Sequence, residues 1–481
     1  MTTRTRFSPS PTGKIHLGNV RAALYSALFA SKHQGVFVLR IEDTDAVRSE
    51  ERYVDSLMID LKWLGIEWQE GPAVHGDYGP YWQSQRQSIY EKYYQILEEK
   101  KLIYPCFCTD QELNLSRKLQ LSRGQAPRYA RTCRGLSQEE IEKRLASGRK
   151  PAWRFEVPSQ TKIEFVDTIK GPQAFQSDDI GDFIVRRADG TPPFLFCNAI
   201  DDAEMKISHV LRGEDHLANT PRQIMLLKTL NLPVPYYGHL PLIVGDDGAP
   251  LSKRHGSFSV EELRKEGYLS ISLINYLSRL GHSCDTQALL PFHELAKHFD
   301  LEKLSRSPAR FDKNQLLYWQ KLAVQSLDMN GFWRWIGDEI QEQIPAAKQA
   351  LFVECIKANV VFPHDVLLWG KIFFHHHIHF DEAAISHLQE AGEQFFVEAE
   401  QAFDQYGLDV NAVLAEMKKT LGLSGKKLFM PLRLALTGQT HGPELAQIAT
   451  LLGQKKIKER LGDVIKQMSG RESSSSGRVS P

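Results

Sequence analysis

The 481-residue sequence lacks several features that would place it outside the soluble intracellular proteins. No apolar run approaches the roughly 18 residues of a membrane-spanning helix, and the first residues lack the charged-then-apolar pattern of a secretory signal. Its six cysteines show no regular spacing along the chain, which fits a reducing compartment better than a disulfide framework. We therefore expect a cytoplasmic protein without a membrane partner.

Net charge is also lacking, because Lys plus Arg and Asp plus Glu both total 59. Nucleic-acid binding therefore has to be argued from local patches and not from overall charge. No internal repeat is evident. The length predicts about three domains, and an apolar fraction of 42% is ample for packed cores.

Two distant segments, residues 9–19 (PSPTGKIHLGN) and residues 251–256 (LSKRHG), carry the strongest functional signal. The first lies between a predicted strand at 3–7 and a helix at 20–31 with apolar residues at helical spacing. Phosphate is favoured at such a helix N-terminus, and Gly13 and Gly18 allow a nucleotide to approach closely. Together the segments predict two sides of an ATP site. An ordinary turn with a surface histidine, His16, is the alternative.

A second predicted strand at 36–41 is followed by the acidic run Glu42-Asp43-Thr44-Asp45. Strand, helix and strand then form a right-handed crossover. Ligands of open parallel sheets bind beyond the carboxyl ends of the strands, so Arg6, Ser8, Ser10 and Glu42 are expected to face one crevice. A solvated acidic turn is the alternative for residues 42–45.

Five ordered signatures resemble those of class I aminoacyl-tRNA synthetases, and within them the chain is similar to the bacterial glutamyl-tRNA synthetases. The signatures are RFSPSPTG at 6–13 with HLGN at 16–19, RIEDTD at 40–45, HVLRGEDH at 209–216 with NTPRQ at 219–223, LSKRHG at 251–256, and MPLR through TG at 430–438. The resemblance spans nearly the whole chain.

The resemblance implies an α/β fold: a doubly wound, parallel-sheet, Rossmann-like catalytic domain with an α/β insertion, followed by an all-helical anticodon-binding region. Strand-like runs at 152–157, 162–167 and 183–187 support the insertion, and amphipathic patterns at 367–374 and 382–403 support the helical region. The expected divisions are 1–105 and 186–245 (catalytic), 106–185 (acceptor-end insertion), 246–325 (stem contact), 326–470 (anticodon binding) and 471–481 (disordered tail).

For ATP, which the family uses with Mg²⁺, the resemblance assigns His16 and Lys253 to catalysis, where they would hold charge that develops on the phosphates. Arg254 would assist, and Pro250 stands where the family often has lysine. The full ATP-binding set is Pro9, Ser10, Pro11, Thr12, Gly13, His16, Leu17, Gly18, Asn19, Leu251, Ser252, Lys253 and Arg254.

For glutamate, the resemblance implies a cationic pocket in which Arg6 and Arg212 bind the side-chain carboxylate as planar bidentate donors. Relatives usually carry tyrosine where this chain has Phe194. An ion pair between Arg212 and Glu214 is the structural alternative. The substrate-binding set is Arg6, Ser8, Ser10, Glu42, Phe194, Asn198 and Arg212.

Three thiols, Cys106, Cys108 and Cys133, can supply most of a tetrahedral zinc site. Relatives often have Cys or His where Gly135 stands, so Tyr129 is the candidate fourth ligand, as in some paralogues. Three unbridged thiols are the alternative. Cys197, Cys284 and Cys355 are expected in the core. The run at 375–379 (HHHIH) is not expected to bind metal, because neighbouring residues of a helix or strand point in different directions.

Nine basic residues between Arg123 and Arg154, and clusters at 418–419, 426–427 and 455–460, would contact tRNA phosphates if each lines one surface. A solvated helix face is the alternative for the first patch. The expected partners are glutamate and tRNA, with tRNA(Glu) or tRNA(Gln) as acceptor, and the family's usual form is a monomer. A related enzyme that glutamylates a modified tRNA base and an inactive tRNA-binding paralogue are the competing hypotheses.

Overall fold

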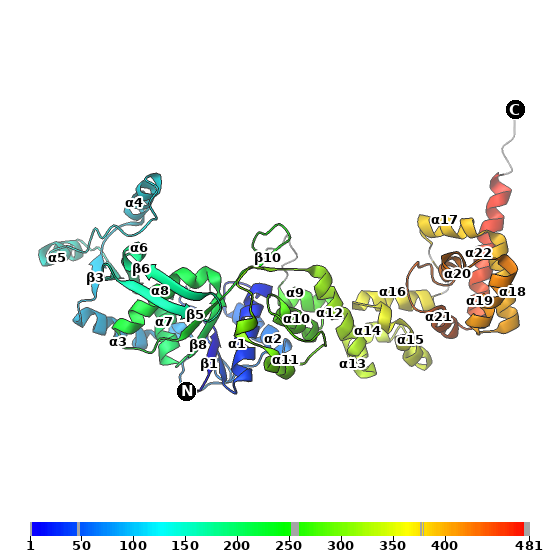
Figure 1. The fold of residues 1–481 in the computed structure, drawn as a ribbon, viewed down its shortest axis with the longest axis horizontal. Helices are drawn as coiled ribbons and strands as arrows, with labels where there is room; N and C mark the ends of the chain where they lie inside the picture. The colour runs from blue at the N-terminus through cyan, green and yellow to red at the C-terminus, as the bar shows by residue number, and fades with distance from the viewer. Residues whose placement is uncertain (1, 46–48, 252–258, 376–377, 379, 476–481) are drawn as a thin grey trace, which may run out of the picture. The chain divides into compact units, whose positions relative to one another are not determined.

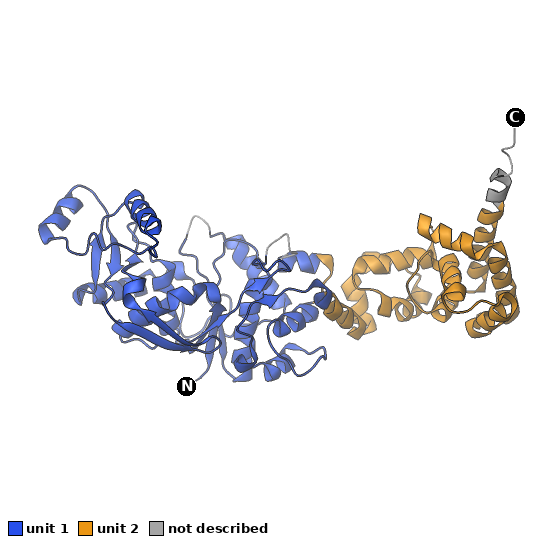
Figure 2. Cartoon of the chain, turned by 45° about the horizontal axis from the view of Figure 1, so that its top comes forward, with its two compact units in different colours: residues 1–265, 270–316 blue, residues 266–269, 317–481 orange. Residues whose placement is uncertain are grey.

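The computed structural model describes residues 2–45, 49–251, 259–375, 378 and 380–475. The chain divides into two compact units (Figure 2): unit 1 holds residues 1–265 and 270–316, and unit 2 holds residues 266–269 and 317–481. None of the described helices combines the length and the apolar character needed to span a membrane.

Unit 1 mixes helices and strands (Figure 1). Its strands are β1 (Arg4–Phe7), β2 (Val36–Leu39), β3 (Ile103–Cys106), β4 (Ala152–Phe155), β5 (Lys162–Asp167), β6 (Gly171–Gln176), β7 (Phe183–Arg186), β8 (His209–Gly213), β9 (Tyr236–Leu240), β10 (Ile243–Val244) and β11 (Ala309–Arg310). Its helices are α1 (Leu17–Lys32), α2 (Glu51–Trp63), α3 (Gln87–Glu99), α4 (Asp110–Ser122), α5 (Gln138–Ala146), α6 (Ser177–Ile180), α7 (Phe194–Glu204), α8 (Thr220–Thr229), α9 (Val260–Glu266), α10 (Ser270–Arg279) and α11 (Phe292–His298).

Two parallel strand pairs, β1–β2 and β8–β9, form the base of the site. They lie side by side, because the backbone N–H of Ser208, just before β8, donates to the carbonyl of Arg4 in β1 at 2.9 Å. Helix α1 packs on β1, β2 and β8, and Leu24 and Leu28 of this helix are fully buried. The carboxyl ends of all four strands therefore meet at one edge, as open parallel sheets require of a ligand site.

The segment between α3 and α7 forms an antiparallel sheet in the order β3-β4-β7 and a hairpin, β5–β6. Its helices α4 and α5 begin with complete capping boxes, Thr109 with Glu112 and Ser137 with Glu140. Neither helix buries a residue. Capping thus supports two helices that have little packing of their own.

Unit 2 is helical throughout its described residues (Figure 1). Phe352, Phe396 and Leu432, each fully buried, lie in a single apolar core that runs through the unit. Its helices are α12 (Lys313–Ser326), which begins in unit 1, α13 (Met329–Ile336), α14 (Asp338–Gln341), α15 (Gln349–Ile356), α16 (Pro363–Phe374), α17 (Glu382–Ala391), α18 (Glu393–Tyr406), α19 (Val410–Leu421), α20 (Lys426–Thr437), α21 (Leu445–Leu452) and α22 (Gln454–Ser475).

The predicted fold class is confirmed, and the amphipathic patterns at 367–374 and 382–403 are helical as expected. The amphipathic pattern at 382–403 is two helices, because Gly392 adopts φ 81° and ends α17 before α18 begins. Helix α22 extends to Ser475, and residues 476–481 of the predicted tail lie outside the described residues. The finer six-part division of the chain stays a prediction.

Candidate active site

A cavity of about 930 Å³ in unit 1 opens at the carboxyl ends of β1 and β8. It brings together thirteen of the predicted residues from both the ATP and the glutamate sets: Arg6, Ser8, Pro9, Ser10, Thr12, Gly13, His16, Gly18, Asn19, Glu42, Phe194, Asn198 and Arg212. Pro11, Leu17 and Leu251 do not line it, and Leu17 is a fully buried core residue. Ser252, Lys253 and Arg254 lie outside the described residues.

The predicted ATP side of the cavity is the turn from β1 into α1. His16 is the N-cap of α1, and its side chain makes no capping hydrogen bond. The first backbone N–H groups of α1 have no partner within the helix, which suits them to an anionic ligand. Burial lowers the pKa of His16, so its ring is mainly neutral near pH 7 and offers one N–H donor.

Arg212 is an unusual cation of the cavity, because its hydrogen-bond partners among the described residues are all neutral. Its Nη2 donates to Thr220 Oγ1 and to Gln223 Oε1, both at 2.8 Å, and its Nε faces His239 Nε2 at 3.2 Å. Its Nη1 is buried and has no hydrogen-bond partner. Burial lowers the pKa of Arg212 to about 10, and the nearby charge of Arg6 contributes to this shift.

Arg6, in contrast, shares a carboxylate. Its Nε donates to Asp202 Oδ1 at 3.1 Å, and Arg40 Nη1 donates to the same oxygen at 2.8 Å. Burial alone would raise the pKa of Asp202, but the two guanidinium groups hold it below its ordinary value. Arg6 is therefore partly neutralised before any ligand arrives.

A chain of hydrogen bonds joins residues of the predicted glutamate-binding set. Asn198 Nδ2 donates to Glu42 Oε1 at 2.6 Å, and Asn198 Oδ1 accepts from Gln223 Nε2 at 3.1 Å. Gln223 in turn accepts from Arg212. Burial raises the pKa of Glu42, although Arg40 and Arg6 favour its charged form. The chain thus holds an acceptor, Glu42, and a donor, Arg212, at fixed places in one cavity.

Ser8 adds a polar group with unused capacity, since its hydroxyl is buried and has no hydrogen-bond partner. Ser8 and Arg212 line the same cavity. Buried polar groups are normally satisfied, and an unsatisfied one needs an explanation such as a ligand. The cavity is therefore arranged to receive an anionic, hydrogen-bonding molecule.

Comparison with known proteins agrees with this geometry. Residues 2–318 match the family described as the class I (E and Q) tRNA synthetase catalytic domain, and residues 324–465 match an anticodon binding domain. Glutamate–tRNA ligase 2 of Coxiella burnetii is 54% identical over 95% of this chain and 98% of its own. The corresponding protein of Nitrosococcus oceani is 53% identical over 96% of this chain and 98% of its own.

The chain belongs to the glutamate–tRNA ligase family. It is accordingly a class I aminoacyl-tRNA synthetase. A solved glutamate–tRNA ligase from Elizabethkingia meningosepticum, in complex with its amino acid, superposes with a TM-score of 0.84 at 30% identity and covers 97% of this chain and 100% of that one.

Several site residues of the synthetase were missed from the sequence, and one alternative is excluded. Thr220 and Gln223 lie inside a recognised signature, but only their contact with Arg212 shows what they do. His239 sits near the carboxyl end of β9, a position that the rule for parallel sheets could have singled out. Glu214 pairs with Lys170 and not with Arg212, so the alternative ion pair was wrong.

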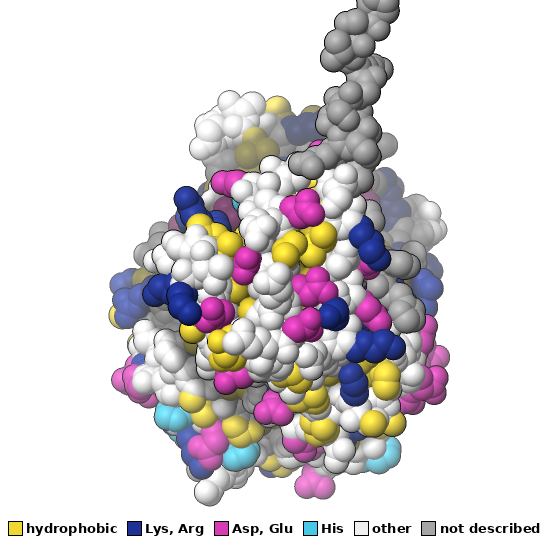
Figure 3. Space-filling model, turned by 90° about the vertical axis from the view of Figure 1, so that its right-hand side faces the viewer, with side chains coloured by type: hydrophobic (Ala, Val, Ile, Leu, Met, Phe, Trp, Pro, Cys, Tyr) yellow, Lys and Arg dark blue, Asp and Glu magenta, His cyan; other side chains and the backbone are white. Residues whose placement is uncertain are grey.

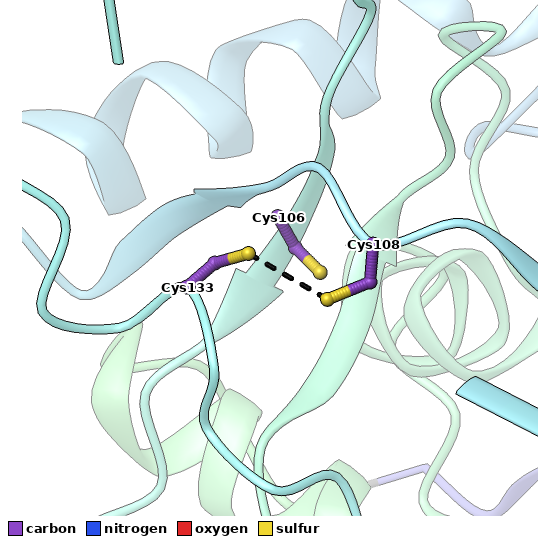
Figure 4. Close-up of side chains that lie close together, drawn as sticks. All are labelled: Cys106, Cys108 and Cys133. Carbon is purple, nitrogen blue, oxygen red and sulfur yellow. Dashed lines mark hydrogen bonds between the residues drawn. The ribbon is translucent and has the colours of Figure 1, made fainter. Parts of the chain in front are cut away.

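The three predicted thiols of the synthetase lie together at the end of β3 (Figure 4). All three sulfur atoms are within 4.8 Å of one another, and Cys108 Sγ is 3.6 Å from Cys133 Sγ. The phenolic oxygen of Tyr129 lies 3.3 Å from Cys106 Sγ and 3.6 Å from Cys108 Sγ. The four groups that the sequence picked out are thus assembled in one place.

The burial predicted for the remaining cysteines is confirmed in part, and only part of the histidine run lies in the described residues. Cys197 and Cys355 are buried, as predicted, but Cys284 is only half-buried. It lies in the segment between α10 and α11, outside the described helices and strands. In the histidine run, His375 follows α16 as its C-cap, and His376, His377 and His379 lie outside the described residues.

The predicted basic patch of the insertion turns partly inward. Arg154 is buried with its guanidinium 3.7 Å from the centre of the Tyr129 ring, and Arg131 pairs with Asp182 at 3.4 Å. A cavity of about 600 Å³ beside the thiols is nevertheless lined by Arg117, Arg128, Arg144, Arg149 and Arg154. Part of the patch therefore remains a basic surface.

The cluster at 455–460 is not one basic surface. Arg460 is buried and donates to the carbonyls of Leu436 and Ile372, and Lys458 pairs with Asp404 at 2.7 Å. Helical periodicity turns successive residues of α22 to different sides. On the face in Figure 3, Lys and Arg side chains are interspersed with Asp and Glu.

Helix α9, which follows the undescribed residues 252–258, is tied to the ATP side of the cavity. The N–H of Val260 donates to the carbonyl of Ile15 at 3.0 Å, and Glu261 pairs with Lys14 at 2.8 Å. At the other end of α9, Arg264 Nη2 lies 3.4 Å from Asp60 Oδ1 of α2. Asp60 is fully buried and neither of its oxygens accepts a hydrogen bond.

Replacement of Asp60 by Asn should remove a pH dependence of stability. Burial raises the pKa of Asp60 to about 6 from its ordinary 3.8. The stabilisation of the folded protein that comes from this raised pKa is therefore complete below about pH 4 and is lost as pH rises through about 6. The unfolding free energy of Asp60→Asn minus that of wild type should increase by about 2 kcal/mol from pH 4.5 to pH 7.5, as measured by urea unfolding.

The matched control is Asp55→Asn, which makes the same chemical change at an exposed aspartate of the same helix. A difference between Asp60→Asn and wild type that stays constant with pH would contradict the assignment.

Proposed function

We propose that the cavity of unit 1 joins glutamate and ATP into glutamyl-adenylate, from which the glutamyl group passes to the 3′-terminal adenosine of tRNA(Glu). The observation that carries this proposal is Arg212, a buried guanidinium that lines the cavity with neutral partners and one unpartnered nitrogen. The carboxylates of Asp202 and Glu42 act on Arg212 only from a distance. A buried cation that no described carboxylate contacts directly calls for an anionic ligand.

Glutamate satisfies the polar groups of the cavity. Its side-chain carboxylate would take Arg212 and Arg6 as planar donors, whereas the neutral amide of glutamine would leave the buried charge uncompensated. Its α-ammonium group would lie near Glu42, which is held by Asn198. Ser8 and Ser10 would orient the backbone end of the amino acid. The phenyl ring of Phe194, packed on His216 with centroids 5.2 Å apart, supplies an apolar wall.

The chemistry needs positioning and charge stabilisation, and no covalent enzyme nucleophile. The α-carboxylate of glutamate attacks the α-phosphorus of ATP, and pyrophosphate leaves. The terminal ribose hydroxyl of tRNA then attacks the acyl carbon, and AMP leaves. His16 and the N-terminus of α1 would hold phosphate oxygens from one side, and Lys253 from the other. Mg²⁺ would accompany ATP with few protein ligands.

Replacement of Arg212 by Gln should raise the KM for glutamate about 100-fold while the KM for ATP changes little, because a buried charge-assisted pair is lost. The measurement is steady-state aminoacylation of tRNA(Glu) with varied glutamate. Arg310→Gln removes an exposed arginine and serves as the matched control. An unchanged KM for glutamate in Arg212→Gln would refute the proposed anchor.

For the acceptor, tRNA(Gln) is a second candidate because Phe194 and Pro250, which both line the cavity, depart from the usual family residues. We expect charging of a purified tRNA(Glu) transcript in an assay with radiolabelled glutamate, and we expect the Lys253→Ala variant to lose it. Equal or preferential charging of tRNA(Gln) would favour the second candidate and require an amidotransferase downstream. Absence of Lys253-dependent charging of either tRNA would favour the inactive paralogue. A monomer in the cytoplasm remains the expected form.

The cluster of Cys106, Cys108, Cys133 and Tyr129 would hold a structural zinc ion. Sulfurs around a tetrahedral zinc lie about 3.8 Å apart at Zn–S distances of about 2.3 Å, close to the spacing of Cys108 and Cys133 here. Burial alone would raise the pKa of Cys106, but interactions with Tyr129 and Arg154 that favour the thiolate bring it below its ordinary value. Arg154 and Arg144 would offset the negative charge of three thiolates.

Protein purified without chelators should contain about one zinc ion per chain by mass spectrometry of the metal, and Cys108→Ser should contain far less. Tyr129→Phe should hold zinc more weakly if the phenolic oxygen is the fourth ligand. Cys284→Ser, outside the cluster, should keep the wild-type content. Equal zinc contents in wild type and Cys108→Ser would instead favour three unbridged thiols.

A further inference from the structure

We propose that His239 and Asp167 are positioning residues that orient Arg212 for the side-chain carboxylate of glutamate and leave its charge uncompensated. This inference rests on the proposed function, in which Arg212 binds that carboxylate. Neither residue lines the cavity, so both would act through Arg212 and not by touching the substrate.

Strand pairing brings His239 to Arg212. The two residues are Cα partners in the parallel pair β8–β9, and paired residues of neighbouring strands project to the same face of a sheet. The imidazole of His239 is fully buried, with Nε2 3.2 Å from Arg212 Nε and 3.0 Å from Thr220 Oγ1. A hydrogen bond from Arg212 requires that this nitrogen carry its lone pair and not a proton.

Asp167 decides which nitrogen of His239 carries the proton. Its Oδ2 lies 2.5 Å from His239 Nδ1, and its Oδ1 accepts from the backbone N–H groups of Ile169, Lys170 and His239 at 2.9, 2.8 and 3.2 Å. Burial alone would raise the pKa of Asp167, but these donors hold it below its ordinary value. A charged carboxylate can only accept, so Nδ1 carries the proton and Nε2 is left as an acceptor for Arg212.

Because His239 is neutral, the positive charge of Arg212 remains available to the carboxylate of glutamate. Burial lowers the pKa of His239, and the charge of Arg212 adds to the shift, so the ring is neutral in the folded protein. With Thr220 and Gln223, it fixes the Nε and Nη2 sides of the guanidinium without neutralising it. A carboxylate in place of His239 would orient the group equally well but would supply the counter-charge that glutamate otherwise brings.

The test compares two amides in place of the imidazole. Asn places its amide near Nδ1 and keeps the contact with Asp167, whereas Gln reaches the position of Nε2 and can still accept from Arg212. In aminoacylation by the full-length enzyme, His239→Asn should raise the KM for glutamate about tenfold with kcat and the KM for ATP nearly unchanged. His239→Gln should recover most of the glutamate affinity.

Asp167→Asn provides a second variant if His239→Asn does not fold. Its single amide oxygen cannot serve both the three backbone N–H groups and Nδ1–H, so the amide NH₂ turns to His239 and moves the imidazole proton to face Arg212. We expect the same selective rise in the KM for glutamate. Equal KM values in His239→Asn and His239→Gln, or an equal rise in the KM for ATP, would overturn the positioning role.

The outcome with Arg212→Gln distinguishes the proposed anchor role of Arg212 from the proposed positioning role of His239. A raised KM for glutamate in Arg212→Gln together with an unchanged KM in His239→Asn would overturn only the role of His239. An unchanged KM in Arg212→Gln would overturn the anchor and, with it, this inference.

Discussion

The active-site region depends on the charge of Arg40, which is fully buried just beyond β2. Its guanidinium meets Asp202 at 2.8 Å, Glu42 at 3.3 Å and Asp201 at 3.9 Å. Taking such charges out of water is costly unless every partner is in place. Because Asp201 and Asp202 belong to α7, the pairs attach that helix to the first strand–helix–strand unit. Helix α7 also carries Phe194 and Asn198, so the width of the glutamate pocket depends on this attachment.

The same network also connects α3 to the site, through Asp201. Asp201 accepts from Arg86 Nε at 2.6 Å and from Gln83 and Tyr90 at 2.9 Å each. Each oxygen of this buried carboxylate is thus satisfied, which is the condition under which a buried charge can be kept. Removal of one member would leave unpaired charges on elements that are far apart in the sequence. The pocket is therefore supported by residues that no ligand contacts.

Local sequence patterns correctly predict elements whose partners are close along the chain. The strands at 3–7, 36–41 and 162–167 alternate or cluster apolar residues as buried strands do, and the structure has β1, β2 and β5 there. Arg6, Ser8 and Glu42 were predicted because they lie at or just beyond the carboxyl ends of the strands in a crossover. At 382–403 the apolar spacing correctly predicts helix, but because it continues across Gly392 it does not show where α17 ends and α18 begins.

The residues that escaped prediction are those whose role comes from long-range contacts. Asp167 and His239 are 72 positions apart, and nothing around either indicates a shared hydrogen bond. Asp201 and Arg86 are 115 positions apart. Composition and periodicity report which face of an element is buried, but they do not report which polar side chains meet inside. The signature around Arg212 predicts the proposed anchor, but only the structure shows which side chains hold it.

The contrast between Arg6 and Arg212 follows from these contacts and bears on how a carboxylate is selected. Arg6 already shares Asp202 with Arg40, so its attraction for a further anion is reduced. Arg212 has only neutral partners and gains a full counter-charge when an anion binds. Glutamine fits the same volume but brings no charge, and a buried cation left unpaired is among the most costly arrangements in a protein interior. The proposed choice of glutamate over glutamine therefore depends chiefly on Arg212 and on the neutrality of the groups around it.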